Sequence, residues 1–329
     1  METSRALIAD QHRPGVVAVE DLELGDPGGE VTIAVVASGV NFKDAMAAET
    51  GNRIVRRDRL VLGVDLAGVV TDPGDSTFAV GQEVLAHGYG LGVDHDGGFT
   101  TVARVPAPWV VEMPAGLTAR QAMILGTAGF TAYCSLVALE HHGLTPGSGP
   151  LLVTGASGGL GSVAVALATR AGYEVVASSG KAASHDYLTE LGATAVIGRD
   201  EIADRPDRVL ATPRWAGAID CVGGTTLAAV LRSLRYGAAV AASGLTAGAE
   251  LGTTVYPFIT RSVALLGIDA VEMEPTTRQR HWQGLAARVG GDWLEQIVAE
   301  TVGLEGLPAA LTQVRTAQVT GRILVDPRA

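Results

Sequence analysis

The sequence predicts an α/β protein in which a β-rich segment is followed by a doubly wound parallel sheet. Short strand-like runs broken by Gly, Pro and Asp fill residues 1–110. From about residue 148, continuous apolar strands alternate with helical stretches, which is the pattern of a parallel sheet covered on both faces. One of these strands runs into a glycine-rich turn, within LLVTGASGGLGS at residues 151–162.

The first segment owes its β-rich character to short apolar runs, each bounded by turn residues. They are RALIA (5–9), VTIAVVASGV (31–40), LGVDLAGVV (62–70), QEVLAH (82–87) and FTTVARV (99–105). Thr118 and Gln121 have the spacing of a capping box, and they predict the start of a helix.

The helix that follows has the length of a membrane span, because 19 uncharged residues separate Arg120 from Glu140. It also contains Gln121 and other polar side chains, and Gly126 and Gly129 would interrupt it. These features favour a buried, broken helix, and no membrane partner is expected.

The second segment is predicted to alternate strands and helices. Strands are expected over residues 151–155, 173–178, 194–197, 216–222, 237–243 and 262–268, with helices over 160–171, 185–192 and near 225–234. After about residue 271 come helical stretches such as 281–289 and a last strand, RILV (322–325). This tail is too small to form a domain, so we expect it to pack on the first segment.

Composition restricts the class of protein. Of the 329 residues, 47% are hydrophobic, so the chain can bury a large core, and its length suits two domains. The net charge of −11 argues against a nucleic-acid partner, because phosphate backbones need a basic surface. Cys134 and Cys221 form no CxxC pattern, and METSRALIAD has no apolar signal core, so we expect a reduced, cytoplasmic protein.

The glycine-rich turn predicts a dinucleotide site because it lies between a strand and a helix. Gly155 permits the tight turn, and Gly158 and Gly159 let a pyrophosphate approach the backbone. Gly161 lets the helix pack closely on the strand. The alternative is a tight turn that binds nothing.

The end of the next strand indicates which dinucleotide binds. An NAD site commonly ends this strand with Asp or Glu, which bonds the ribose hydroxyls. Here the strand ends in ASSGK (177–181), without an acid. Hydroxyl groups and the Lys181 ammonium suit a 2′-phosphate, so the sequence predicts NADPH as the cofactor. An ordinary polar loop is the alternative.

Several segments together resemble the medium-chain dehydrogenase/reductase superfamily and, within it, the acrylyl-CoA reductase group. They are SGVNFKDAM (38–46), GVDLAGVV (63–70), GQEVLAHGYGLG (81–92), MILGTAGFTA (123–132), VTGASGGLGS (153–162), GAIDCVGG (217–224) and TVYPFITRSVALLGID (254–269). The resemblance implies a GroES-like catalytic domain over residues 1–122 and 271–329 and a Rossmann NADPH-binding domain over residues 123–270. It also implies a zinc-independent reductase of enoyl thioesters. The chain is similar to quinone oxidoreductases as well.

The residues argue against zinc. Zinc alcohol dehydrogenases of this superfamily carry Gly-His-Glu where this chain has Gly63, Val64 and Asp65, and they use a cysteine near NFKD and a four-cysteine lobe. Two isolated cysteines cannot build either site. Hydride addition to an activated double bond needs no metal, so no metal site is expected.

The resemblance assigns cofactor contacts by position in the chain. They are Ser157, Gly158, Gly159 and Leu160 at the pyrophosphate, Ser179, Gly180 and Lys181 at the 2′-phosphate, Arg199 at a phosphate or the adenine, and Phe42, Thr127, Leu245 and Ile259 at the nicotinamide. For Leu245 and Ile259 the alternative is a place in the core, and for Arg199 a place on the surface.

The cluster NFKD, residues 41–44, is the candidate catalytic group. Many relatives carry tyrosine where this chain has Phe42, and a phenyl ring cannot donate a proton. The proton donor is therefore sought in Lys43, Asp44 or ordered water, with Asn41 as a further candidate. The alternatives are a structural ion pair between Lys43 and Asp44 and a turn anchored by Asn41.

A basic loop follows this cluster, in GNRIVRRDRL at residues 51–60. We expect Arg56 and Arg53 to bind the phosphates of coenzyme A, because guanidinium groups bind phosphate in a bidentate fork. The alternative is a solvated loop balanced by Asp58.

Three functions are open at this point. The first is NADPH-dependent reduction of the double bond of a short-chain 2-enoyl-CoA, of the acrylyl-CoA to propionyl-CoA type. The second is an NADPH:quinone or enone oxidoreductase, and the third is a protein that binds NADPH without catalysis. The substrate would be a small molecule, an acyl-CoA or an enone. The apolar run SVALLGI (262–268) predicts a homodimer if it lies at the edge of the sheet.

Overall fold

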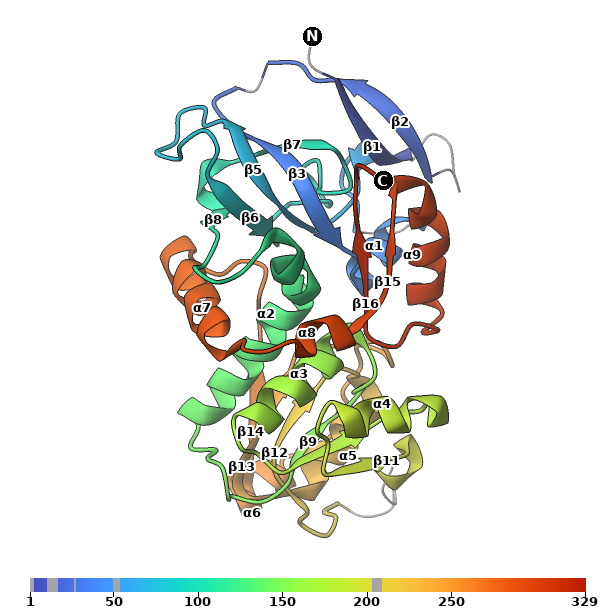
Figure 1. The fold of residues 1–329 in the computed structure, drawn as a ribbon. Coiled ribbons are helices and arrows are strands. Elements are labelled where there is room, and N and C mark those ends of the chain that lie inside the picture. Colours follow the sequence, from blue (N-terminus) through green and yellow to red (C-terminus); the bar gives the residue numbers. More distant parts are fainter. Residues whose placement is uncertain (1–2, 11–16, 27, 50–53, 203–208) are drawn as a thin grey trace. The chain divides into compact units, whose positions relative to one another are not determined.

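The computed structural model describes the chain except for residues 1–2, 11–16, 27, 50–53 and 203–208. The chain forms two compact units, one of Met1–Thr127 with Ala270–Ala329 and one of Ala128–Asp269 (Figure 1). The first unit is β-rich and the second holds a parallel sheet whose strands are joined by helices. The predicted α/β fold class is therefore confirmed.

The first unit is built on a small and a larger sheet. In the small sheet, β1 (Thr3–Asp10) pairs antiparallel with β2 (Val17–Glu23) and with β4 (Arg59–Val61). The larger sheet has the order β15-β16-β3-β5-β6-β8, and β7 also pairs with β3. Its strands are β3 (Val31–Gly39), β5 (Asp65–Asp72), β6 (Glu83–His87), β7 (Val102–Val105), β8 (Val110–Glu112), β15 (Val298–Val302) and β16 (Arg322–Val325).

The C-terminal segment completes the larger sheet. Strand β16 pairs antiparallel with β3, with Leu324 opposite Gly39, and parallel with β15. Helix α9 (Leu307–Arg315) buries Leu307 and Leu311 in the same core as Ala45 of helix α1 (Phe42–Ala47). The C-terminal segment thereby supports the short helix that carries residues 42–47.

Helix α7 (Pro275–Arg288) also belongs to the first unit. It begins after Glu274, whose side chain accepts hydrogen bonds from the N–H groups of Thr276 and Thr277. It buries Arg278, Trp282 and Leu285, a spacing that places all three on one face of the helix. The short helix α8 (Trp293–Gln296) follows it.

Helix α2 (Ala119–His141) is broken at Gly126, where φ is 50° and ψ is −157°. Its start is closed by the predicted capping contact, in which the Gln121 N–H donates to Thr118 Oγ1 at 3.2 Å. Among the described residues this helix alone is long and apolar enough to cross a membrane, and 83% of its most apolar window is buried inside the structure. The prediction of a buried, broken helix is confirmed.

The second unit is built on a parallel sheet with the order β11-β10-β9-β12-β13-β14. Its strands are β9 (Leu151–Val153), β10 (Val175–Ser178), β11 (Ala195–Ile197), β12 (Trp215–Asp220), β13 (Leu234–Ala242) and β14 (Ala264–Gly267), and its further helices are α3 (Gly159–Arg170), α4 (His185–Glu190), α5 (Gly224–Ser233) and α6 (Tyr256–Arg261). The strand order reverses at β9. In open α/β sheets, ligands bind beyond the carboxyl ends of the strands at such a point.

The structure differs from the prediction at the run 62–70, which is not one strand. Gly63 has a φ of 105°, a conformation that favours glycine, and it turns the chain between β4 and β5. Strand β5 therefore begins only at Asp65. The short strand β2 and the helix α9 lay outside the predicted elements.

The close approach predicted at Gly161 generates a test of packing. A Cβ at this position would collide with the Gly155 carbonyl oxygen and lie 2.6 Å from Ala156 Cα. We expect Gly161→Ala to lower the free energy of unfolding by about 1–3 kcal/mol, although alanine favours a helix by about 1 kcal/mol. Gly290→Ala, where a Cβ meets nothing within 4 Å, is the control and should change stability by less than about 0.5 kcal/mol. Equal urea midpoints for both variants would contradict this account.

Candidate functional site

The glycine-rich turn follows the carboxyl end of β9, which is an interior strand of the parallel sheet of the second unit. Gly155 has a φ of 60°, and the chain then enters α3 at Gly159, with Gly158 as the N-cap. The first N–H groups of a helix have no partner within it, so this 12-residue helix offers the N–H groups of Gly159, Leu160 and Gly161 to an anion. The predicted pyrophosphate residues thus lie together at one helix N-terminus.

A buried carboxylate braces the turn. Asp220, at the end of β12, accepts hydrogen bonds from Thr154 Oγ1 at 2.6 Å and from the Gly223 N–H at 2.7 Å. Thr154 Oγ1 in turn accepts from the Cys221 N–H at 3.1 Å. Burial raises the pKa of Asp220, and these hydrogen bonds oppose the increase. The contact ties the ends of two neighbouring strands together beside the turn.

Three buried serine hydroxyls join the turn to the loop after β10. Ser184 Oγ donates to the Lys181 carbonyl at 2.7 Å, so its 2.9 Å contact with Ser179 Oγ is a bond donated by Ser179. Ser179 therefore accepts from Ser157 Oγ at 2.9 Å, and it also accepts from the Lys181 N–H at 3.1 Å. This chain orders the loop. A contact between the Ser179 hydroxyl and a phosphate would require that hydroxyl to leave Ser184.

Two cationic side chains lie close together in the same loop region. Burial and the nearby Arg199 guanidinium lower the pKa of Lys181. Gly180 is packed so closely against Arg199 that a Cβ at this position would collide with the guanidinium. Adjacent like charges repel each other, and a phosphate between them would relieve this repulsion. The residues at the end of β10 thus fit a phosphorylated nucleotide.

The two predicted nicotinamide contacts of the second unit lie on its surface. Leu245, after β13, is 54% exposed, and Ile259 on α6 is 71% exposed. Neither belongs to the core of this unit, which was the alternative for both. Their contact with the nicotinamide stays a prediction.

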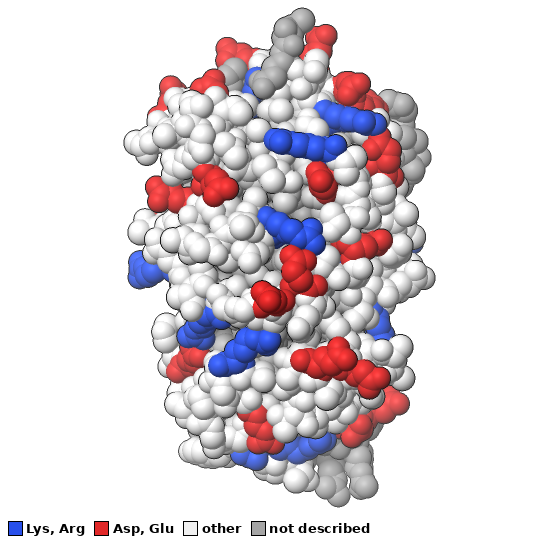
Figure 2. All heavy atoms as spheres, viewed as in Figure 1, with Lys and Arg blue, Asp and Glu red and all other residues white. Residues whose placement is uncertain are grey.

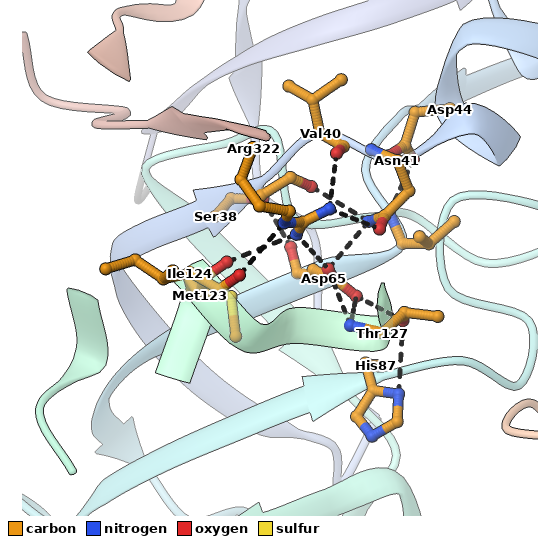
Figure 3. Close-up of polar contacts among 12 residues, drawn as sticks. Ser38, Val40, Asn41, Asp44, Asp65, His87, Met123, Ile124, Thr127 and Arg322 are labelled. Carbon is orange, nitrogen blue, oxygen red and sulfur yellow. Dashed lines mark hydrogen bonds and ion pairs between the residues drawn. The ribbon is translucent and has the colours of Figure 1, made fainter. Parts of the chain in front are cut away.

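A second group of polar residues is buried in the first unit, around the carboxylate of Asp65 (Figure 3). Asp65 accepts hydrogen bonds from Thr127 N at 3.1 Å, from Thr127 Oγ1 at 2.5 Å and from Asn41 Nδ2 at 2.8 Å. Arg322 Nη2 lies 3.5 Å from the same carboxylate. All these groups are donors, so Asp65 acts only as an acceptor, as an ionised carboxylate does.

Arg322 is the cation of this cluster and is 2% exposed. Its Nη1 donates to the Val40 carbonyl at 2.8 Å and to Asn41 Oδ1 at 2.9 Å, and its Nε donates to the Ile124 carbonyl at 3.1 Å. Burial lowers the pKa of Arg322, and the charge of Asp65 opposes this. One guanidinium thus joins β16, the end of β3 and the first half of α2.

Two of the predicted catalytic residues are parts of this buried structure. The two carboxylate oxygens of Asp44 accept from the N–H groups of Asn41 at 2.8 Å and of Val64 at 2.9 Å, so Asp44 closes the start of α1. The Asn41 amide bonds both Asp65 and Arg322. Both side chains therefore have structural partners, and their catalytic roles stay predictions.

Phe42 and Lys43, the other members of NFKD, are half-buried on α1. Within the described residues, no ion pair joins Lys43 to Asp44, which was the alternative to a catalytic role. Of the three predicted catalytic residues, Lys43 is thus the one whose side chain lies outside the buried cluster.

His87, at the end of β6, adjoins the cluster through Thr127, whose Oγ1 lies 3.3 Å from His87 Nδ1. Trp282 Nε1 donates to His87 Nε2 at 2.9 Å, and Arg278 Nη1 donates to the His87 carbonyl at 2.6 Å. Burial and the Arg278 charge lower the pKa of His87 well below its usual 6.5. The imidazole is therefore neutral at physiological pH.

The basic loop is described in part. The Arg56 side chain is 72% exposed and lies 3.5 Å from Asp94, and Arg59 pairs with Glu20 at 2.5 Å. Arg53 lies outside the described residues. On the face shown in Figure 2, basic side chains are interspersed with acidic ones.

Asp65, Arg322, His87, Arg278 and Trp282 are central to the first unit, and the sequence assigned none of them to the site. A signal existed for two of them. Arg322 is a charged residue at the start of an otherwise apolar strand, RILV, and such a residue is expected to have a buried partner. Asp65 occupies an apolar strand in the same way.

Comparison with known families matches both parts of the chain. Residues 27–115 match the alcohol dehydrogenase GroES-like domain, and residues 159–288 match the zinc-binding dehydrogenase family. The described residues contain no group of three or more His, Cys, Asp or Glu side chains that could hold a metal ion.

Three proteins illustrate what the chain is similar to. The acrylyl-CoA reductase AcuI of Ruegeria pomeroyi is 47% identical over 95% of this chain and 94% of its own length. The yhdH oxidoreductase of Salmonella enterica, in complex with NADP, has a TM-score of 0.92 and 43% identity over 98% of this chain and 99% of its own. YhfP of Bacillus subtilis, described as a putative quinone oxidoreductase, is 45% identical over 94% of this chain and 92% of its own. Its crystal structure with NAD bound gives a TM-score of 0.95 at 43% identity, over 99% of this chain and 100% of that one.

The buried position of Asp44 generates a pH prediction. Burial and the charge of Asp65 raise the pKa of Asp44 from 3.8 to about 7, against the N–H bonds from Asn41 and Val64 and the charge of Arg322. Between these two values the folded protein binds more protons than the unfolded chain, so its stability falls as the pH rises from about 4 to about 7. We expect the difference in unfolding free energy between the native protein and Asp44→Asn to change by up to about 4 kcal/mol across this window.

Urea denaturation at several pH values measures this difference. Asp186→Asn, which alters an exposed carboxylate on α4, is the control and should give a curve parallel to that of the native protein. A parallel curve for Asp44→Asn as well would show that Asp44 does not titrate in this range.

Proposed function

The chain belongs to the medium-chain dehydrogenase/reductase superfamily, and we propose that it uses NADPH to reduce the carbon–carbon double bond of a short-chain 2-enoyl-CoA. The reaction is of the acrylyl-CoA to propionyl-CoA type. The observation that carries the proposal is the 47% identity, over 95% of this chain, to a protein named acrylyl-CoA reductase. The residues of the second unit support the cofactor, because the end of β10 offers hydroxyls and cations in place of an acid.

NADPH, when bound, supplies the hydride for the β-carbon of the substrate. The N–H groups at the start of α3 would hold its pyrophosphate, and Lys181 and Arg199 would hold the 2′-phosphate. The serine chain from Ser157 to Ser184 keeps the loop that carries Lys181 in one conformation. Preorganised donors bind an anion without the cost of ordering them first.

The reaction also requires a proton for the α-carbon and a group that stabilises charge on the thioester oxygen. We assign the proton to Lys43, because Asn41 and Asp44 have their polar atoms engaged in the buried cluster. A correctly placed proton donor accelerates such a step by about 10²–10⁴. The Lys43 ammonium group can supply this proton, whereas the neighbouring phenyl ring of Phe42 has no proton to give.

The coenzyme A moiety offers phosphates to which a guanidinium can bind in a bidentate fork. Arg56 supports this role because its side chain is 72% exposed and its ion pair with Asp94, at 3.5 Å, is long. An exposed pair of this kind stabilises the fold by little, so a phosphate can replace the carboxylate at small cost. Arg53 is proposed as a second contact on sequence alone.

Reduction of a quinone or an enone is the second candidate. It is favoured by the 45% identity to YhfP, which is described as a putative quinone oxidoreductase. Such substrates carry no coenzyme A and make no demand on Arg56, so the two functions can be separated at this residue.

We also infer that the enzyme is a cytoplasmic homodimer. Strand β14 is at an edge of the parallel sheet. Leu265 on this strand is 38% exposed, and Val255, directly before helix α6, is 63% exposed. A second copy of the chain could pair with this edge and cover these side chains. The mass in solution tests this inference.

The 2′-phosphate assignment generates the first test. We expect Lys181→Glu to weaken NADPH binding by about 100-fold, or about 3 kcal/mol, because it replaces an attractive charge by a repulsive one. NADH binding should change by less than about threefold, since NADH has no phosphate at this position. The control is Arg235→Glu, the same change of charge at the start of β13, and it should leave both affinities unchanged. Fluorescence titration measures them, and equal losses for the two cofactors would refute the assignment.

The substrate assignment generates the second test. NADPH consumption is measured with acrylyl-CoA, crotonyl-CoA and a simple quinone side by side, and we expect the highest kcat/KM with acrylyl-CoA. Arg56→Ala should lower kcat/KM for the CoA substrates by about 10-fold, or about 1.4 kcal/mol, and leave the quinone unaffected. Arg59→Ala, which removes a guanidinium already paired with Glu20, is the matched control. Activity with the quinone alone would establish the second candidate, and binding without any turnover would indicate a non-catalytic NADPH-binding protein.

A further inference from the structure

The second unit has a cavity at the amino end of its parallel sheet, with a volume of about 180 Å³. It is lined by the end of α2, the loop that follows this helix, the start of β12 and the first half of β13 (Figure 1). Ala216 lies near the start of β12, and Ser148 precedes β9. The glycine-rich turn follows the carboxyl end of β9. The cavity and the predicted nucleotide site are therefore at opposite ends of the same sheet.

The cavity lies at an irregularity in the pairing of β12 with β13. On β12, Trp215 and Gly217 are two positions apart. Their partners on β13, Leu234 and Ala239, are five positions apart, so β13 carries three extra residues here. Bulges are rare between parallel strands, and they change the direction in which side chains point. The residues of this bulge line the cavity.

Arg235, in this bulge, brings a positive charge to the cavity. Its Nη1 donates to the Ser148 carbonyl at 2.9 Å, and a Cβ at Gly149 would collide with the same nitrogen. These contacts hold one side of the guanidinium. Within the described residues Arg235 forms no ion pair, so no carboxylate of this part of the chain balances its charge. A guanidinium presents N–H groups in a planar fork that matches an oxyanion.

The rest of the lining divides into a polar rim and an apolar wall. His142 and Tyr236 lie at the rim and are exposed, and an imidazole or a phenol can donate a hydrogen bond to an anion. The inner wall is buried and consists of Leu139, Leu144, Ala238 and Ala239. Burying polar oxygens against such a wall is unfavourable. The lining therefore suits an anion that also has an aliphatic part.

The volume limits the size of the occupant. An apolar protein cavity of about 150 Å³ holds a benzene molecule. A cavity of about 180 Å³ therefore has room for roughly six or seven non-hydrogen atoms. Butanoate, with four carbon and two oxygen atoms, has this size.

We propose that this cavity binds a short-chain carboxylate such as butanoate, with the carboxylate on Arg235 and the methylene groups against Leu139 and Leu144. The site does not depend on the proposed function, because it uses neither the glycine-rich turn nor the NFKD cluster.

Ligand-observed NMR titration of the full chain tests the proposal. We expect butanoate to bind in the millimolar range, as suits a ligand of about six non-hydrogen atoms. Butanamide, which has the same shape without the charge, should bind at least about 10-fold more weakly, because hydrogen bonds to charged groups are the stronger ones. Acetate should also bind about 10-fold more weakly, because it lacks two methylene groups that would cover the apolar wall. Inorganic phosphate, which has no apolar part, should bind more weakly than butanoate.

Variants of the lining identify the site. Arg235→Ala should weaken butanoate binding by about 10- to 100-fold, and Arg235→Lys should recover only part of this loss, because it restores the charge without the fork. Ala216→Leu should abolish binding with Arg235 in place, because the larger side chain fills the cavity from β12. The control is Arg328→Ala, which removes the same charge from the first unit and should keep the native affinity.

The outcomes decide each part of the proposal. Failure of the native protein to bind butanoate, or binding that survives unchanged in Arg235→Ala, would overturn the site. Equal affinity for butanamide would refute recognition of the charge. Phosphate binding as tight as that of butanoate would refute the assignment of a carboxylate. Should Ala216→Leu fail to fold, the exposed Arg235 still allows the two arginine variants to decide.

Discussion

The buried pair of Asp65 and Arg322 is the interaction on which the first unit depends. Removing two charges from water costs several kcal/mol for each ion, and their mutual attraction repays this only when the remaining donors and acceptors are also satisfied. Here the pair and its partners together come from four places in the chain: the end of β3, the start of β5, the break in α2 and strand β16. The loss of Asp65 or of Arg322 leaves the other charge buried without its counter-ion. The pair therefore specifies how these four segments meet more than it adds to stability.

The second unit uses the same principle on a smaller scale. Asp220 is buried at the end of a strand, and its partners are a hydroxyl and an N–H group instead of a cation. These bonds hold the ends of β9 and β12 together at the point where the glycine-rich turn begins. The serine chain then extends this order to the loop after β10. In both units, buried polar groups order the backbone, and the groups proposed to meet the ligand are the less buried Lys181, Arg199 and Lys43.

Local sequence patterns were sufficient for the second unit and insufficient for the buried cluster. Apolar runs and the glycines of 155–161 indicate strands, a turn and a helix because these features depend on residues that are close in sequence. Arg322 and Asp65 are separated by 257 positions, and no local periodicity links them. Asp44 was singled out from the NFKD motif. Its structural role depends on the hydrogen bond that the Val64 N–H donates to its carboxylate, and the motif gives no sign of this contact. The break at Gly126 was anticipated, whereas the reason for it, the space taken by Asp65 and Arg322, was not.

The place of Arg322 in the chain has a consequence for biosynthesis. The ribosome completes the whole second unit at residue 269 and must add 52 further residues before it reaches Arg322. At about 5–20 residues per second this takes about 3–10 s. Throughout that interval the nascent first unit holds Asp65 without its guanidinium. The order of translation thus lets the nucleotide-binding half mature first, while the half that surrounds Thr127 is finished only when its last strand arrives.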